Sequence, residues 1–175
     1  MSRLVKLSPL LVLALLLSGC GFHLRQSVAL PPSMQRIHLA VNNGGDLQRN
    51  LARALRNAGI TIEDASGPGI AELAVPQARF STDTLSISGG ARVTEYSVHY
   101  QVRFGVTDAN GKVMLPPQDI QMSREYSYDA TNTIGNDAQV EEIQRSLVDD
   151  MVQSILFRLQ AAAKRADAAA AAGTP

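Results

Sequence analysis

Cysteine and aromatic residues are scarce in this sequence. Its 175 residues include one cysteine, four phenylalanines, four tyrosines and no tryptophan. A single cysteine cannot form an internal disulfide, and it is too few for a cysteine-rich zinc or iron–sulfur site. Stability must therefore come from packing, in a core built mainly of aliphatic side chains.

The sequence also lacks an excess of either charge, because 16 Lys and Arg residues balance 16 Asp and Glu residues and the formal net charge is zero. Removing Arg3 and Lys6 with the N-terminal segment described below leaves a slight acidic excess. This balance excludes the strongly basic footprint of a nucleic-acid-binding protein, so no nucleic-acid partner is expected. The histidines, His23, His38 and His99, show no metal-ligand spacing, and we expect neither a metal nor a cofactor.

Only one long apolar run is present, and it lies near the N-terminus. Two basic residues precede residues 7–17, which are apolar apart from Ser8 and Pro9. The run is too short for a permanent membrane-spanning helix and has the length of a signal-peptide core. It ends in Leu17-Ser18-Gly19-Cys20, which matches the bacterial lipobox, with small residues before the cysteine.

We therefore expect residues 1–19 to be a lipoprotein signal peptide. Cys20 would become the first mature residue, with a diacylglyceryl group on sulfur and an acyl chain on nitrogen. Several acyl chains anchor a protein stably where one chain is marginal. The alternatives are an ordinary secretory signal with an incidental cysteine, or an uncleaved anchor. Gly21 replaces the aspartate that commonly signals inner-membrane retention, which favours the outer membrane.

The rest of the chain predicts a single domain over residues 36–162, after a leader over residues 20–35 that contains a stiff proline pair. Helical periodicity predicts one helix that is capped by Asp46 and ends at Gly59, and a second helix that starts at Asp137. Strand character is found at residues 37–41, 60–62, 70–80 with an extension to 87, 96–106 and 112–128, and glycine-containing turns at 88–91 and 108–111.

The clearest periodicity lies between Tyr96 and Val106, where apolar and polar residues alternate. Such alternation is typical of an antiparallel strand with one face on a core and one polar face. Pro76 interrupts an earlier strand, and because proline cannot donate to a ladder we expect it at an edge or a bulge.

The order of elements predicts an α+β fold. We expect a two-layer sandwich, with two helices packed on one face of a roughly four-stranded, mostly antiparallel or mixed sheet. The second helix carries a broad apolar stripe from Val140 to Leu159, which requires a sheet beneath it. The opposite sheet face is left to water or to a partner. The alanine-rich residues 163–175 have nothing to pack against, and we expect them to be disordered.

Two patterns that could carry chemistry have simpler explanations. The glycine loop before Asp46 lacks the lysine and hydroxyl of a phosphate-binding loop, and Asp46 occupies the place of the anion, so a plain turn is favoured. His99 with Glu95 and Arg103 could form an acid–base cluster, but polar ladders on exposed sheet faces are common. We therefore do not expect an enzyme.

Three short segments resemble a known family. They are Gly21-Phe22-His23-Leu24-Arg25 directly after the lipobox, Leu30-Pro31 through Met34, and Thr94-Glu95-Tyr96 after a glycine hairpin. Together with the element order they make the chain similar to the LptE family of lipopolysaccharide-assembly lipoproteins. The resemblance implies an outer-membrane lipoprotein that plugs the lumen of the β-barrel LptD in a 1:1 complex. It also implies that the protein helps the barrel to assemble and lipopolysaccharide to reach the outer leaflet.

Direct contact with lipopolysaccharide would require arginines, whose planar guanidinium binds phosphate in a bidentate manner. Arg92, next to the predicted hairpin tip, is the preferred candidate, followed by Arg79 and Arg103. Each of them could instead be a solvated surface arginine. The alternative function is a freestanding lipid-binding or chaperone-like lipoprotein on the periplasmic side of the membrane, without a fixed barrel partner.

Overall fold

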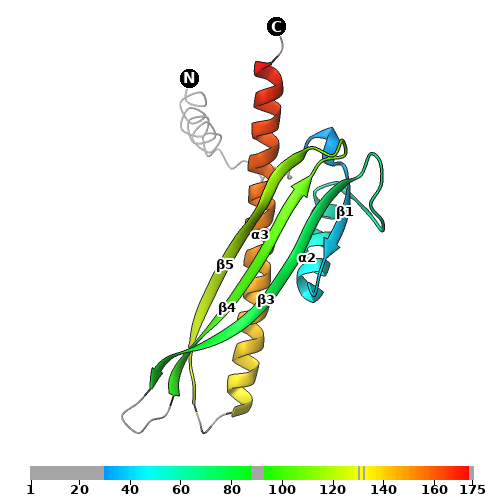
Figure 1. The fold of residues 1–175 in the computed structure, drawn as a ribbon. Coiled ribbons are helices and arrows are strands. Elements are labelled where there is room, and N and C mark those ends of the chain that lie inside the picture. The colour runs from blue at the N-terminus through cyan, green and yellow to red at the C-terminus, as the bar shows by residue number, and fades with distance from the viewer. Residues whose placement is uncertain (1–29, 88–92, 130, 132, 174–175) are drawn as a thin grey trace, which may run out of the picture.

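The computed structural model describes residues 30–87, 93–129, 131 and 133–173 (Figure 1). Cys20, Arg92 and the turn predicted at residues 88–91 lie outside the described residues. In chain order the elements are a 3-10 turn η1 (Pro32–Met34), β1 (Arg36–Val41), α2 (Gly45–Asn57), β2 (Thr61–Glu63), β3 (Ala71–Ile87), β4 (Val93–Thr107), β5 (Val113–Ser127) and α3 (Thr133–Ala172).

The strands form one mixed sheet in the order β2-β1-β3-β4-β5. β1 runs parallel to both β2 and β3, whereas β3, β4 and β5 form an antiparallel meander. The predicted α+β class is confirmed. The expected number of roughly four strands is corrected to five, because the three residues of β2 pair in register with β1 and form the edge of the sheet.

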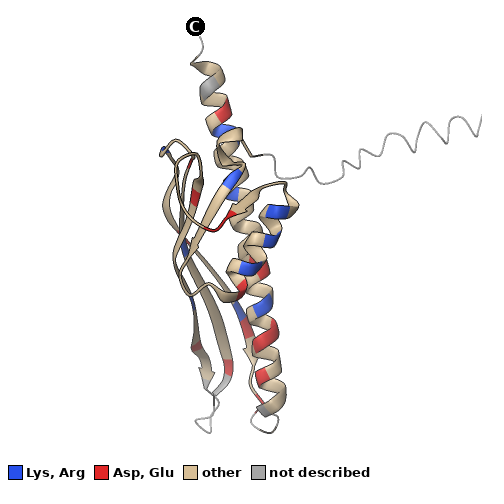
Figure 2. Ribbon diagram, turned by 90° about the vertical axis from the view of Figure 1, so that its right-hand side faces the viewer, with Lys and Arg blue, Asp and Glu red and all other residues tan. Residues whose placement is uncertain are grey.

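Both helices lie on the same face of the sheet (Figures 1 and 2). α2 packs against β1, β2 and α3, and α3 crosses β4 and β5. The opposite face of the three long strands is covered by no helix among the described residues. The fold is therefore two-layered, with one shielded and one open sheet face.

The core follows the periodicities of the sequence. Alternate β4 residues from Val98 to Val106 are buried, and so is the predicted stripe of α3 from Leu147 to Leu159. α2 contributes Leu47, Leu51 and Leu55, which are spaced four residues apart and are fully buried. Aliphatic side chains make up most of this core, as the scarcity of aromatic residues predicts.

Neither predicted helix cap is correct. α2 begins at Gly45, and Asp46 in its first turn forms an ion pair with Arg49. α3 begins at Thr133, one turn before Asp137. The side chain of Asn136 is buried and bonds both backbone groups of Asp129, with its Nδ2 2.7 Å from the carbonyl oxygen.

The prolines of the long strands lie at irregularities of the sheet. Pro76 lies in the register shift between Ala74 and Gln77 relative to β4, which confirms the predicted bulge. Pro116 and Pro117 lie at a second shift, opposite Gly105 of β4. A Cβ atom on Gly105 would be 3.4 Å from Pro117 and from the Leu115 carbonyl, so glycine permits this close approach.

The C-terminal residues differ from the prediction of a disordered tail over 163–175, because α3 continues as a helix to Ala172. Two physical reasons explain the difference. Ala162 and Ala163 are buried, so the helix still packs beyond the predicted domain end. The alanines that follow have the highest intrinsic helix propensity and extend a helix that packing has already nucleated.

Candidate functional site

The open face of β3, β4 and β5 is polar throughout its central part. Its residues alternate along each strand with those that face the helices, and they align in four cross-strand rows. All of them are exposed or partly exposed except Ser97, which is buried. Counted from the C-terminal end of β4 towards its N-terminal end, the rows are Gln77–Arg103–Asp119, Arg79–Gln101–Gln121, Ser81–His99–Ser123 and Asp83–Ser97–Glu125. We refer to these twelve residues as the open face. No large apolar side chain interrupts it.

The two described candidate arginines lie on the open face in adjacent rows. Arg103 donates from Nε and Nη2 to the two carboxylate oxygens of Asp119, at 2.9 and 3.0 Å. This hydrogen-bonded pairing lowers the pKa of Asp119 and raises that of Arg103. Arg79 donates from the same two atoms to Gln101 Oε1, at 3.2 and 2.8 Å. Arg79 is therefore held by a neutral amide, whereas the charge of Arg103 is compensated.

The suspected acid–base cluster is not assembled. His99 Nε2 lies 3.2 Å from Asp83 Oδ2, on the neighbouring strand. Glu95 and Arg103 are four residues away from His99 in either direction along β4, roughly 13 Å. The Nδ1 atom of His99 is buried without a hydrogen-bond partner. The histidine thus belongs to a polar ladder.

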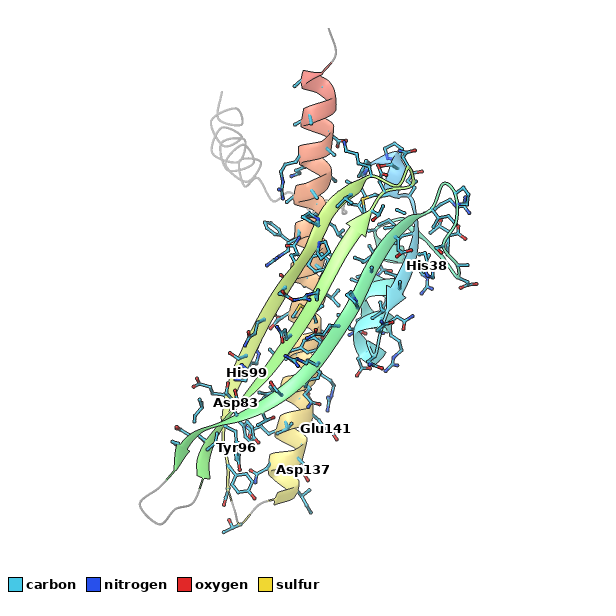
Figure 3. All side chains as sticks on the ribbon, in the orientation of Figure 1. His38, Asp83, Tyr96, His99, Asp137 and Glu141 are labelled. Carbon is cyan, nitrogen blue, oxygen red and sulfur yellow. The ribbon has the colours of Figure 1, made fainter. Side chains whose placement is uncertain are left out.

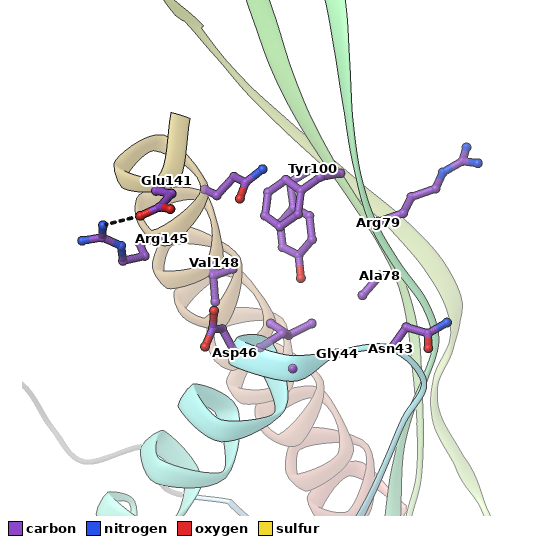
Figure 4. A pocket seen from close by; sticks show the side chains of 13 residues that line it. Asn43, Gly44, Asp46, Ala78, Arg79, Tyr100, Glu141, Arg145 and Val148 are labelled. Atoms are coloured by element: carbon purple, nitrogen blue, oxygen red, sulfur yellow. Dashed lines mark ion pairs between the residues drawn. The ribbon is translucent and has the colours of Figure 1, made fainter. Parts of the chain in front are cut away.

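A cleft of about 350 Å³ opens on the helical side of the sheet (Figure 4). The rings of Phe80 and Tyr100 stack in it with their centroids 4.0 Å apart. Burial, and then the nearby negative charge of Asp46, raises the pKa of Tyr100 to about 12. On the α3 side, Arg145 pairs with Glu142 at 2.8 Å and with Glu141 at 3.6 Å.

The sequence prediction missed this cleft, although a length mismatch between two elements could have indicated it. The 13 residues of α2 span about 20 Å, whereas the 17 residues of β3 span about 56 Å. α2 therefore cannot cover the whole strand. Phe80 lies beyond its end and remains 37% exposed.

In the described part of the chain, no group of three or more His, Cys, Asp and Glu side chains is arranged to hold a metal ion. Neither described helix combines the length and the hydropathy needed to cross a bilayer.

Comparison with protein families matches residues 27–159 to the model described as "LptE: Lipopolysaccharide-assembly". Two similar relatives are both named LPS-assembly lipoprotein LptE. The protein of Yersinia enterocolitica is 26% identical over 158 residues, covering 86% of this chain and 73% of the relative. The protein of Pectobacterium atrosepticum is 26% identical over 152 residues, covering 83% and 79%.

Solved structures share the fold. The solution structure of the uncharacterized lipoprotein B from Nitrosomonas europaea has a TM-score of 0.68 at 24% identity, covering 81% of this chain and 91% of that one. The crystal structure of the rare lipoprotein B from Shewanella oneidensis has a TM-score of 0.66 at 20% identity, covering 75% and 98%.

Proposed function

The chain belongs to the LptE family, and from that premise we propose that it is an outer-membrane lipoprotein that plugs the β-barrel LptD. Family membership itself implies a role in lipopolysaccharide assembly. The finer proposal is a 1:1 complex in which this protein occupies the barrel lumen, supports assembly of the barrel and assists delivery of lipopolysaccharide to the outer leaflet.

The open face is the observation that carries the plug proposal. The lumen of a large membrane barrel is polar, so a plug needs a surface rich in hydrogen-bonding groups. Six of the twelve residues of the open face are Ser or Gln, and Arg103 forms an ion pair with Asp119. Such a surface can bond a polar wall without burying many unpaired charges, which would be costly.

The face assignment is tested by placing a bulky charge in the centre of the open face. We expect Ser81→Arg to fold normally, because Ser81 is exposed, and to reduce recovery of the barrel with the tagged protein at least tenfold. Gln48→Arg, at an exposed position of α2, is the matched control for the helical side. Equal recovery for the two variants would contradict the open face as the main contact.

The membrane anchor is proposed to be Cys20, after removal of residues 1–19. Mass spectrometry of the N-terminal peptide should give a cysteine with a diacylglyceryl group and an N-acyl chain. The Cys20→Ala variant should lose both modifications and should separate from outer-membrane fractions unless the barrel retains it. An unmodified Cys20 in membrane-bound protein would refute this assignment.

Direct binding of lipopolysaccharide is proposed through Arg79 rather than Arg103, with Arg92 as a further candidate. A phosphate can displace the neutral amide of Gln101 from Arg79, but it must compete with a carboxylate for Arg103. Arg79→Gln should therefore weaken lipopolysaccharide binding more than Arg103→Gln, and Arg79→Lys should restore it only in part. The reverse order would contradict this ranking.

A freestanding lipid-binding lipoprotein is the second candidate, and the cleft at Phe80 and Tyr100 favours it. Its volume of about 350 Å³ and its aromatic stack fall within the range of small-ligand sites. Such a carrier should leave the membrane alone in detergent, whereas a plug should leave it only with the barrel.

A further inference from the structure

Among the described residues β5 pairs only with β4, so it forms a free margin of the sheet. The opposite margin, β2, is three residues long, which limits its ability to pair with another chain. β5 has 15 residues. Its first part contains Pro116 and Pro117 at the register shift, but residues 118–127 pair with β4 without interruption, from Phe104↔Gln118 to Glu95↔Ser127. We refer to residues 118–127 as the β5 edge.

The β5 edge has no proline, no lysine and no bulge, which are three of the features that usually protect exposed strands, and its charged residues are Asp119, Arg124 and Glu125. Arg124 is the one charged side chain on its helical side, and it is held at 2.7 Å by Asp150 of α3. A row of backbone N–H and C=O groups therefore faces outward along this edge and can pair with an incoming strand.

α3 offers a second layer for such a strand. Phe157 is 71% exposed and lies seven residues, almost two helical turns, after Asp150. Since Asp150 points to β5, Phe157 lies on the same side of α3. Figure 1 shows the C-terminal half of α3 extending past the β5 margin. A strand added next to β5 would cover the Phe157 side chain with those of its residues that point towards α3.

We propose that the β5 edge binds an extended segment of the barrel partner as a sixth strand. This inference rests on the proposed function. The edge borders the open face, so a partner on that face already lies beside it. The segment would come from a loop or a terminus, because the wall strands of a closed barrel are paired on both sides. Backbone pairing of this kind is a recurrent mode of peptide recognition.

Side chains of the edge define the chemistry of the bound segment. On the helical side, apolar residues would contact Met122, Tyr126 and Phe157. On the open-face side, Glu125 has no cation within the described part of the chain, so a basic residue is expected opposite it. A second copy cannot supply that cation, because the open-face side of its own edge carries Asp119 and Glu125 but no base. The occupant is therefore a different chain.

The test is photo-crosslinking in the full-length, detergent-solubilised complex. A photoreactive amino acid is placed at Phe157 or at Ser123, with Thr61 on the opposite sheet margin as the control site. Both test sites should link to one short contiguous segment of the barrel chain, and Thr61 should not link to it. A complex that purifies intact but gives no such links, or links to a second copy, overturns this inference alone. A protein that purifies without any barrel overturns the proposed function as well.

A substitution series provides an independent readout. Phe157→Asp should weaken the complex about tenfold, as expected for truncation of an aromatic interface residue. Phe157→Leu should retain most of the affinity, because it keeps an apolar cover. Ile134→Asp, on the same helix and 83% exposed, is the matched control and should leave affinity unchanged. Equal loss for both aspartate variants, with normal folding, would refute a specific role of Phe157.

Discussion

Arg79 and Arg103 occupy adjacent rows of one strand pair but have different chemical states. A carboxylate compensates the charge of Arg103, whereas Arg79 is oriented by an amide and keeps an uncompensated charge. The sequence does not predict this difference, because the partners Asp119 and Gln101 lie on neighbouring strands and come opposite the arginines only in one register. The charge state of each arginine's surroundings therefore depends on how the strands align.

The Arg103–Asp119 pair predicts a specific response to acid. The pKa of Asp119 is lower in the folded protein than its ordinary value of 3.8, so the pair stabilises the fold above that pH. This stabilisation is lost as the pH falls through the lowered pKa of the folded state. Titration of the Asp119 carboxyl signal by NMR should show the shift, and Arg103→Gln should return the pKa towards 3.8. An unchanged titration in the variant would contradict the pairing.

Gly44, immediately before α2, is predicted to be intolerant of a side chain. Its φ and ψ angles lie in the right-handed helical region, which any residue can adopt, but an added Cβ would collide with Val41 Cγ1. Gly44→Ala should therefore destabilise the protein by about 1–3 kcal/mol, as over-packing typically does. Gly67→Ala is the control, since its nearest neighbour would be Ile70 Cδ1 at 3.7 Å. Equal denaturation midpoints for the two variants would disprove the steric explanation.

At the scale of helices and strands, sequence periodicity was sufficient to predict which face of an element is buried. The alternation in β4 and the stripe of α3 gave the correct faces, and Pro76 gave the correct bulge. Helix starts were wrong because Asp46 and Asp137 resemble caps locally, whereas Asp46 pairs with Arg49 and the first turn of α3 is tied to Asp129 by Asn136. The cleft was missed because it depends on how far α2 reaches along β3.

α3 is predicted to be the element on which the core depends. Leu147 is 1% exposed, and Leu147→Asp would bury an unpaired carboxylate at a cost of several kcal/mol. We expect loss of the cooperative thermal transition, measured by circular dichroism. Ile134→Asp on the exposed side should melt as the unaltered protein does. A normal transition for Leu147→Asp would show that this face of α3 does not pack on the sheet.

The alanine-rich end of α3 is predicted to contain a short packed part and a longer dispensable part. Deletion of residues 168–175 should change the free energy of unfolding by less than about 0.5 kcal/mol, as for other exposed sites. Deletion from Ala162 onward also removes two buried methyl groups, each worth about 0.8 kcal/mol. Urea titration of both forms measures the difference. Equal stability would mean that the packing of Ala162 and Ala163 contributes nothing.

The whole molecule is elongated, with its long strands and α3 lying side by side (Figure 3). The 40 residues of α3 correspond to about 60 Å, twice the roughly 30 Å of a bilayer core. A plug of this length would fill a barrel through the depth of the membrane and still project from it. The polar open face and the shielded helical core together form a molecule suited to a wet lumen.

The most direct test of the plug function is affinity purification of the tagged, full-length protein from detergent-solubilised outer membranes. The proposed function predicts one large β-barrel protein at equal stoichiometry, retained through gel filtration. Recovery of the acylated protein alone, with the barrel left in other fractions, would contradict it. The cleft at Phe80 and Tyr100 would then become the leading candidate site, for a freestanding lipid-binding lipoprotein.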